Sequence, residues 1–193
     1  MTVSGREMSL RDAVAGRCAV RDFVAQMPDD ALLDRLLQAA VRAPTAMHEE
    51  PWRFAVIRDR NLLNRISERA KALIAARAEG VPPDAAATFT AKEFHVFYNA
   101  PVLIVVGTEA PGRFADADCW LAAENLMLAA HAEGLGSCVI GLALDALNDA
   151  DVKRAAGLPA GFTAVAPVIV GVPAHPAALR PTPRKPPQVV LRA

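Results

Sequence analysis

Two kinds of hydrophobic pattern occur along the chain, and together they predict a mixture of helices and strands. Apolar residues recur every three or four positions in the longer stretches, as on one face of an amphipathic helix, and short apolar runs lie between them. Because strands and helices do not alternate steadily, the pattern favours an α+β fold. The expected helices cover residues 9–16, 31–43, 61–78, 115–133 and 149–156, and the expected strands cover 52–58, 101–108 and 164–172, with a short apolar segment at 137–140.

Polar, glycine and proline residues mark where these elements begin and end. Ser9 is a suitable N-cap for the first helix, and Gly16 is a suitable terminator. Prolines at both ends of residues 44–51 predict a loop there. Residues 79–91 contain a glycine, two prolines and many small side chains, which suggests a mobile excursion or lid.

Three features indicate contact with a second chain. The stretch 115–133 is apolar around most of its circumference, so we expect it to lie buried or at a subunit interface. The proline-rich tail, residues 173–193, is expected to be extended and to end in a strand-like piece at 188–191 without a local partner. An apolar content of 53% is also more than one small core readily absorbs.

Composition and charge narrow the class of protein. A length of 193 residues suits one globular domain over 1–193, and the high apolar content argues against disorder. The formal net charge is zero, which favours neither a nucleic-acid binder nor a binder of anionic membranes. The N-terminus lacks an apolar signal region and the apolar runs are too short to span a bilayer, so we expect a cytoplasmic protein with three free thiols.

The common site motifs are absent, and weaker segments remain. The sequence holds no G-x-G-x-x-G, Walker, H-E-x-x-H or G-x-S-x-G motif, and its four histidines lack metal-ligand spacing. In G-R-C-A-V-R-D-F, residues 16–23, Arg17 and Arg21 offer fixed donors suited to phosphate oxygens and to a planar carbonyl edge. Two solvated surface arginines would explain this segment alone equally well.

Three further segments are candidates, and two of them are open to two interpretations each. The loop within A-P-T-A-M-H-E-E-P-W-R-F, residues 43–54, can place His48 over a ligand, or it is a structural turn beside a core tryptophan. The glycines of G-L-G-S-C-V-I-G-L, residues 134–142, permit close approach to a flat ligand, or they end a helix before a buried strand. P-R-K-P, residues 183–186, adds a basic pair in the tail.

In their order and spacing, these segments resemble the flavin-dependent (FMN) nitroreductase family. The family's opening motif, close to R-x-S-x-R-x-F, is matched by Arg17, Arg21 and Phe23. A-P-S-x-x-N-x-Q-P-W resembles residues 43–52, and Q-N-L-L-L-A-A-H-A-L-G-L-G-T-C resembles residues 124–138. The resemblance covers nearly the whole chain. It implies a nitroreductase-like α+β fold with a central, mostly antiparallel sheet flanked by helices, in an intertwined homodimer.

The resemblance also implies FMN as cofactor, bound at the subunit interface, and assigns its contacts. Arg17 would contact the phosphate with help from the tail, and Arg21 would lie at the pyrimidine edge of the flavin. The implied cofactor-binding residues are Arg17, Cys18, Ala19, Arg21, Ala46, Met47, His48, Glu50, Ile140, Gly141, Leu142, Arg184 and Lys185. NAD(P)H would reduce the flavin, and a nitroaromatic, quinone or similar electrophile would reoxidise it by ping-pong hydride transfer. The flavin carries this chemistry, so no catalytic side chain and no metal is implied.

Four departures from the family pattern leave alternatives open. Ala19 stands where serine is usual, His48 where asparagine is usual, and Glu50 and Glu124 where glutamine is usual. These changes remove a phosphate-binding hydroxyl and add carboxylates near an anionic cofactor. A non-catalytic protein that binds or sequesters flavin is therefore the alternative to an enzyme. A dimeric scaffold that has lost the cofactor is a third.

Overall fold

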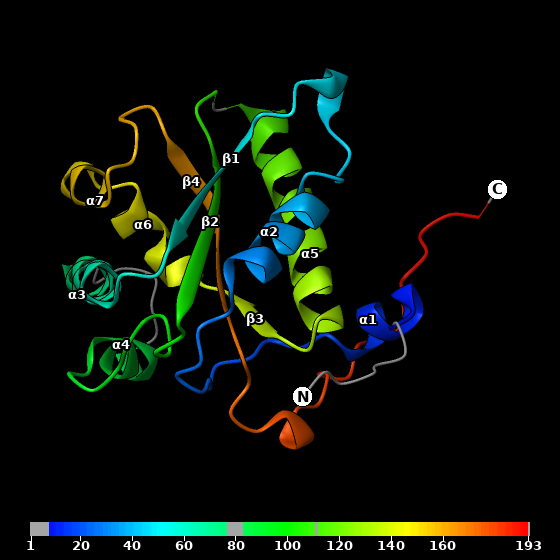
Figure 1. The fold of residues 1–193 in the computed structure, drawn as a ribbon, viewed down its shortest axis with the longest axis horizontal. Coiled ribbons are helices and arrows are strands. Elements are labelled where there is room, and N and C mark those ends of the chain that lie inside the picture. The colour runs from blue at the N-terminus through cyan, green and yellow to red at the C-terminus, as the bar shows by residue number, and fades with distance from the viewer. Residues whose placement is uncertain (1–7, 77–82, 111, 193) are drawn as a thin grey trace.

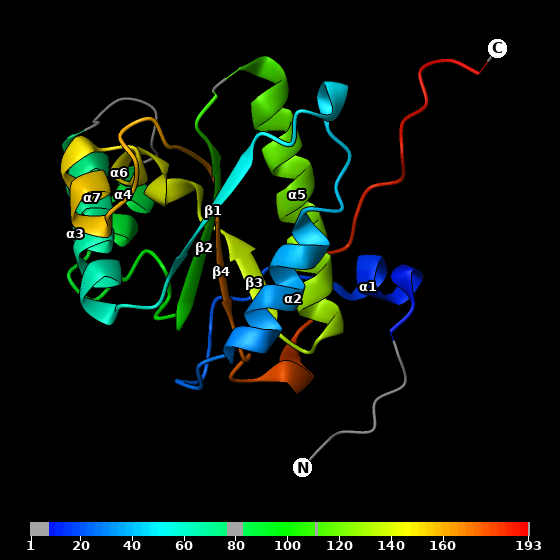
Figure 2. The same ribbon diagram turned by 45° about the horizontal axis from the view of Figure 1, so that its top comes forward.

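The computed structural model describes residues 8–76, 83–110 and 112–192, which form three layers with one sheet in the middle (Figures 1 and 2). The strands are β1 (Trp52–Ile57), β2 (Val102–Thr108), β3 (Gly136–Val139) and β4 (Thr163–Gly171), in the order β1-β2-β4-β3 with antiparallel neighbours. The helices are α1 (Leu10–Gly16), α2 (Asp30–Ala40), α3 (Arg60–Ala76), α4 (Pro83–Thr90), α5 (Arg113–Ala132), α6 (Leu144–Leu147) and α7 (Ala150–Ala156). Short 3-10 turns are η1 (Ala46–His48), η2 (Gly141–Ala143) and η3 (Pro176–Ala178).

The order of the strands follows from their hydrophobic patterns. Every residue of β2 is buried, as is nearly all of β4, and continuous apolar runs of this kind suit the centre of a sheet covered on both faces. β1 is buried only at its two end residues, Trp52 and Ile57, and forms one edge. β3 forms the other edge and is only four residues long. The predicted antiparallel α+β fold is therefore confirmed.

Two cores hold the layers together, one on each face of the sheet. On one face, α2 and α5 pack through fully buried side chains such as Leu36 and Leu126. On the other, α3 and α6 pack through Ile66 and Leu147, with Phe97 from the loop before β2. Complete burial of one such side chain stabilises a fold by about 1.5–3 kcal/mol.

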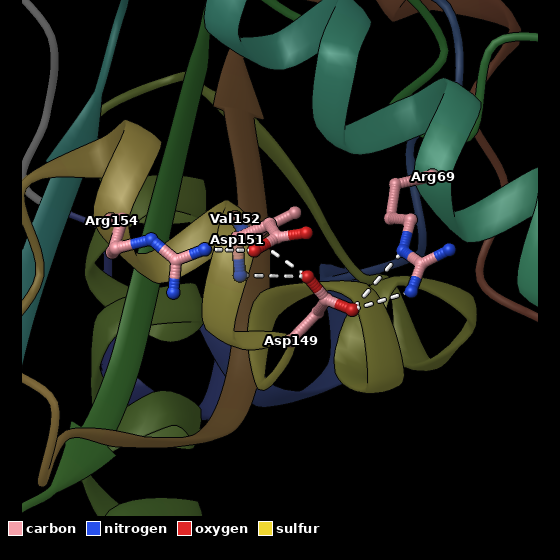
Figure 3. A network of polar contacts seen from close by, with 5 residues as sticks. All are labelled: Arg69, Asp149, Asp151, Val152 and Arg154. Atoms are coloured by element: carbon pink, nitrogen blue, oxygen red, sulfur yellow. Dashed lines mark hydrogen bonds and ion pairs between the residues drawn. The ribbon is translucent and has the colours of Figure 1, made fainter.

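Capping side chains set where several helices begin. Ser9 accepts a hydrogen bond from the backbone N–H of Asp12, so its predicted role as the N-cap of α1 is confirmed. Asp149 caps α7 in the same way and also accepts hydrogen bonds from Arg69 of α3 at 2.6 and 3.1 Å (Figure 3). The hydrogen bonds from Arg69 lower the pKa of Asp149, and the contact ties α7 to α3.

The segment from Arg17 to Val24, called the arginine segment below, lies along the free edge of the sheet. Ala19 forms a parallel bridge with Ser137, and the Val20 N–H donates to the Ser137 carbonyl at 3.0 Å. Further along, the Val24 N–H donates to the carbonyl of Val172, just beyond β4. The segment is thus fixed near both of its ends by the sheet.

Two glycines allow this close approach. A Cβ atom on Gly136 would lie 2.7 Å from Cβ of Val20, and one on Gly171 would lie 2.9 Å from Cδ1 of Phe23. Contacts this short do not occur between carbon atoms in folded proteins, so any larger residue would push the arginine segment away from the sheet.

The structure adds to the sequence-based expectations in one place and differs from them in another. Residues 83–90, within the expected excursion or lid, form the helix α4, and residues 79–82 lie outside the described part. Alanine and threonine there can propagate a helix after Pro83, which is tolerated in a first turn. Residues 188–191 form no strand and are exposed, since a strand needs a partner to satisfy its backbone groups. Among the described residues, no helix is both long and apolar enough to cross a membrane.

We predict that Gly136→Ala destabilises the protein by about 1–3 kcal/mol, because the added methyl group overlaps Val20. Urea unfolding measures the free energy, and hydrogen exchange at the Val20 amide reports whether its bond to Ser137 is lost. Gly161→Ala is the matched control, since a Cβ there meets no atom within 4 Å. Equal stability of the two variants would contradict the packing described above.

Candidate functional site

Arg17 lies at the end of α1 and faces α5. Its Nε lies 3.3 Å from Oε1 of Glu124, and the two side chains are 24% and 47% exposed. The neighbouring Gly16 packs against His131, seven residues further along α5, because a Cβ on Gly16 would lie 2.7 Å from Nε2 of that ring. Burial, and then the charge of Arg17, lower the pKa of His131. The half-buried guanidinium of Arg17 is therefore fixed against one face of α5.

Arg21 lies four residues after Arg17 in the segment, beside β3 and the loop before β2. Its guanidinium carbon is 5.8 Å from the centroid of the Tyr98 ring, within cation–π range. Burial raises the pKa of the Cys138 thiol, while the charge of Arg21 and its hydrogen bond to the sulfur act in the opposite direction. Within the described residues, Arg21 makes no ion pair with a carboxylate, so its charge is available to an anion.

Cys18 and Ala19, the two residues after Arg17, have simpler surroundings. Cys18 is partly exposed, and Ala19 is exposed with its backbone bridged to Ser137. Because its side chain is a methyl group, Ala19 offers no hydrogen bond to an anion.

Ile140, Gly141 and Leu142 follow directly after β3, the strand whose Ser137 bonds to the arginine segment. Ile140 is buried, and its N–H donates to the Pro167 carbonyl at 2.8 Å. Gly141 is exposed, and a Cβ there would meet no atom within 4 Å. The first and third candidate segments of the sequence are therefore brought together along β3, with open space at Gly141.

The loop at residues 46–50 is held elsewhere, near the beginning of α5. The Ala46 N–H donates to both carboxylate oxygens of the buried Asp118, at 3.3 and 3.1 Å. Met47, His48 and Glu50 all have positive φ, and the Met47 side chain is 86% exposed. Left-handed backbone at three side-chain-bearing residues is costly and is often retained for function.

This loop does not meet the arginine segment within one chain. Asp118 and Glu124 lie six residues apart on α5, which separates them by about 9 Å along the axis and places them on different faces. In Figure 1, the cyan turn η1 lies near the beginning of α5, while α1 lies near its end. Arg184 and Lys185, in the tail, are exposed and extended.

Sequence reasoning missed the residues that surround Arg21. Phe89 of α4, Phe94 and Tyr98 form an aromatic row, with ring centroids 5.6 and 5.5 Å apart, that ends against Arg21. Tyr98 and Asn99 have φ values of 51° and 55°. Asparagine tolerates this left-handed conformation, so the Tyr-Asn pair before Ala100-Pro101 was the available sign of a tight turn.

Two pockets lie apart from this region, both beside α3. One, of about 360 Å³, lies between α3 and α7 next to the Arg69–Asp149 contact of Figure 3. The other, of about 370 Å³, lies near Lys71 and Lys92. Neither is lined by the arginine segment, by β3 or by residues 46–50.

Comparison with known proteins shows which family model and which relatives the sequence resembles. The family model described as "Nitroreductase family" matches residues 14–172. A protein of Methanothermobacter thermautotrophicus named "Putative NADH dehydrogenase/NAD(P)H nitroreductase" is 30% identical over 141 residues, which cover 70% of this chain and 62% of that protein. An iodotyrosine deiodinase of Thermotoga neapolitana is 30% identical over 135 residues, covering 66% of this chain and 71% of the relative.

A solved structure gives the same result for the fold. The crystal structure of a nitroreductase with bound FMN from Bacteroides fragilis superimposes with a TM-score of 0.83 at 25% identity, covering 96% of this chain and all of that one. The nitroreductase-like fold expected from the sequence is therefore confirmed.

We predict that Asp118→Ala destabilises the protein by about 1.5–3 kcal/mol, because it removes a charged acceptor from the Ala46 N–H. Asp118→Asn retains one acceptor oxygen and is expected to cost less. Urea unfolding measures both variants. An alanine variant as stable as the wild type would show that this carboxylate does not anchor residues 46–50.

We predict that Cys18 is the one thiol that reacts rapidly with a disulfide reagent in the native protein. Burial raises the pKa of Cys119 to about 11 and also raises the pKa of Cys138, so both remain protonated and covered at neutral pH. Cys18→Ser is expected to remove the fast phase, and denaturant is expected to expose all three thiols of the wild type. A fast phase that persists in Cys18→Ser would contradict this assignment.

Proposed function

The chain belongs to the nitroreductase family, and from that premise we propose that it is an FMN-dependent oxidoreductase. Its reductant would be NAD(P)H and its acceptor a small electrophilic aromatic compound. The observation that carries the proposal is the arginine segment, which is fixed to the sheet edge at Ser137 and directs Arg17 toward α5 and Arg21 toward Tyr98. Gly141, just after the same edge strand, has open space around it.

The residues present fit the phosphate of FMN. Arg17 is half-buried and fixed in place, which suits a guanidinium that donates to phosphate oxygens. Because Ala19 offers no hydroxyl, more of the phosphate binding falls on Arg17 and on the exposed Arg184 and Lys185 of the tail. The tail needs to fold toward a cofactor site to contribute, whether in its own chain or in a partner.

The residues beside β3 fit the flavin ring. Arg21 would donate to the pyrimidine edge, where a cation stabilises negative charge that develops on the ring. Tyr98 would keep the Arg21 guanidinium in place through the cation–π contact. Gly141 leaves space for a flat ligand to approach the backbone, while the buried Ile140 fixes the start of that turn.

When bound, FMN would supply hydride-transfer chemistry between NAD(P)H and the acceptor. The protein would contribute position and charge: Arg17 would hold the phosphate end, Arg21 the ring edge, and the backbone at Gly141 one face. No side chain of the site is required as a nucleophile for this role.

A second copy of the chain would complete the site. The loop at residues 46–50 is displaced along α5 from the arginine segment, so it would serve the cofactor of a partner rather than its own. Exposed apolar side chains support a homodimer: Phe114, Trp120 and Leu121 on α5, and Val189, Val190 and Leu191 in the tail. Burying them would remove unfavourable apolar surface from water.

The aromatic row favours a planar aromatic acceptor. Phe89, Phe94 and Tyr98 lead from α4 to Arg21, and stacked or edge-on aromatic contacts contribute about 0.5–1.5 kcal/mol each. The names of two relatives, a nitroreductase and an iodotyrosine deiodinase, are compatible with such acceptors. A nitroaromatic compound or a quinone is therefore the acceptor class to test first.

A flavin-sequestering protein on the same fold is the alternative, and two observations favour it. Ala19 lacks a hydroxyl, and Arg17 is already paired with Glu124. Both would weaken cofactor binding without preventing it.

One titration separates these functions. We predict that protein reconstituted with FMN and freed of excess cofactor loses its visible flavin absorbance when titrated anaerobically with NADH or NADPH. Addition of 4-nitrobenzoate or menadione is then expected to restore the absorbance. Protein that holds FMN but is reduced by neither nucleotide would contradict the enzyme and support sequestration. Protein that binds no FMN would contradict both.

A further inference from the structure

The ion pair of Arg17 with Glu124 joins two elements that no other charged contact joins in the described part of the chain. α1 ends at Gly16, which packs against His131 of α5, and the side chain of Arg17 reaches Glu124, two helical turns from His131 on the same face. Val20 and Ser137 fix the next part of the segment. Arg17 therefore has little freedom to turn away from Glu124.

Glu124 offsets the charge of Arg17. It is the only carboxylate in an ion pair with this arginine among the described residues, and the oxygen–nitrogen distance is 3.3 Å. A phosphate that approaches the same guanidinium meets a cation whose charge Glu124 already offsets. The negative charge of the Glu124 carboxylate also repels the phosphate. Both effects oppose binding of an anion, and at a half-exposed site water screens them only in part.

We propose that Glu124 competes with the cofactor phosphate for Arg17 and so sets how strongly the protein prefers FMN over riboflavin, which lacks the phosphate. The inference rests on the proposed binding of FMN by this chain. Glu124 is thus a specificity-determining residue that acts through Arg17 and contacts neither the flavin ring nor the reacting atoms.

The geometry limits the effect to the phosphate end of the cofactor. Arg21, Cys138 and Gly141 lie on the β3 side of the segment, whereas Glu124 lies on α5 beside Arg17. Removing the charge of Glu124 thus changes the field at Arg17 and leaves the contacts around Arg21 in place. Riboflavin, which has only the ring and ribityl chain, reports on that second region alone.

The test compares four proteins by fluorescence titration with FMN and with riboflavin. Glu124→Gln is expected to bind FMN about tenfold more tightly than the wild type, a difference of about 1.4 kcal/mol, and riboflavin within about twofold. Glu133→Gln is the matched control, because it removes the ion pair with Arg35 at the end of the same helix. It is expected to leave both affinities unchanged. The double variant, Arg17→Ala combined with Glu124→Gln, is expected not to show the tenfold gain in FMN affinity.

The other possible results contradict either this inference or the proposed function. Unchanged or weaker FMN binding by Glu124→Gln would overturn the inference, because Glu124 would then be neutral or would position Arg17 for the phosphate. An equal gain for both flavins would overturn it too, since the effect would not depend on the phosphate. If no variant binds FMN at all, the proposed function itself fails, an outcome distinct from FMN binding that Glu124→Gln does not alter.

Discussion

The close packing of the arginine segment on the sheet edge is the constraint on which the candidate site depends. Gly136 and Gly171 present only backbone to Val20 and Phe23, so the segment can approach to hydrogen-bonding distance of Ser137 and Val172. That approach covers part of β3, an edge strand with unpaired backbone groups. It also fixes which way each arginine lies: Arg17 against α5, and Arg21 against Tyr98.

α5 links this site to the rest of the molecule. Its buried face packs on the sheet through residues such as Leu126, while Asp118 holds the 46–50 loop and Glu124 holds Arg17. The two polar contacts lie on different faces of the helix, so one chain presents the loop and the arginines in different directions. In the proposed homodimer, an interface between two copies would bring them together and would give the exposed Trp120 and Leu121 of this helix a structural role.

Most of the fold was predictable because local signals and tertiary packing agree. The continuous apolar run of β2, the period of α5 and the N-cap Ser9 each specify what the structure contains. The helix α4 was not predictable from the pattern, because two adjacent prolines mask its start. The site was only partly predictable: motif order indicated Arg17 and Arg21, but the Glu124 pair and the Tyr98 contact join residues far apart in sequence. No period or local spacing encodes such contacts.

A crystal structure of the protein with FMN is the most direct test of the proposed site. We expect the phosphate to lie against Arg17, the ring edge to lie against Arg21 with one face toward Gly141, and residues 46–50 of a second copy to approach the same cofactor. FMN bound in the pocket between α3 and α7, or bound with its phosphate remote from Arg17, would show that the arginine segment is not the cofactor site.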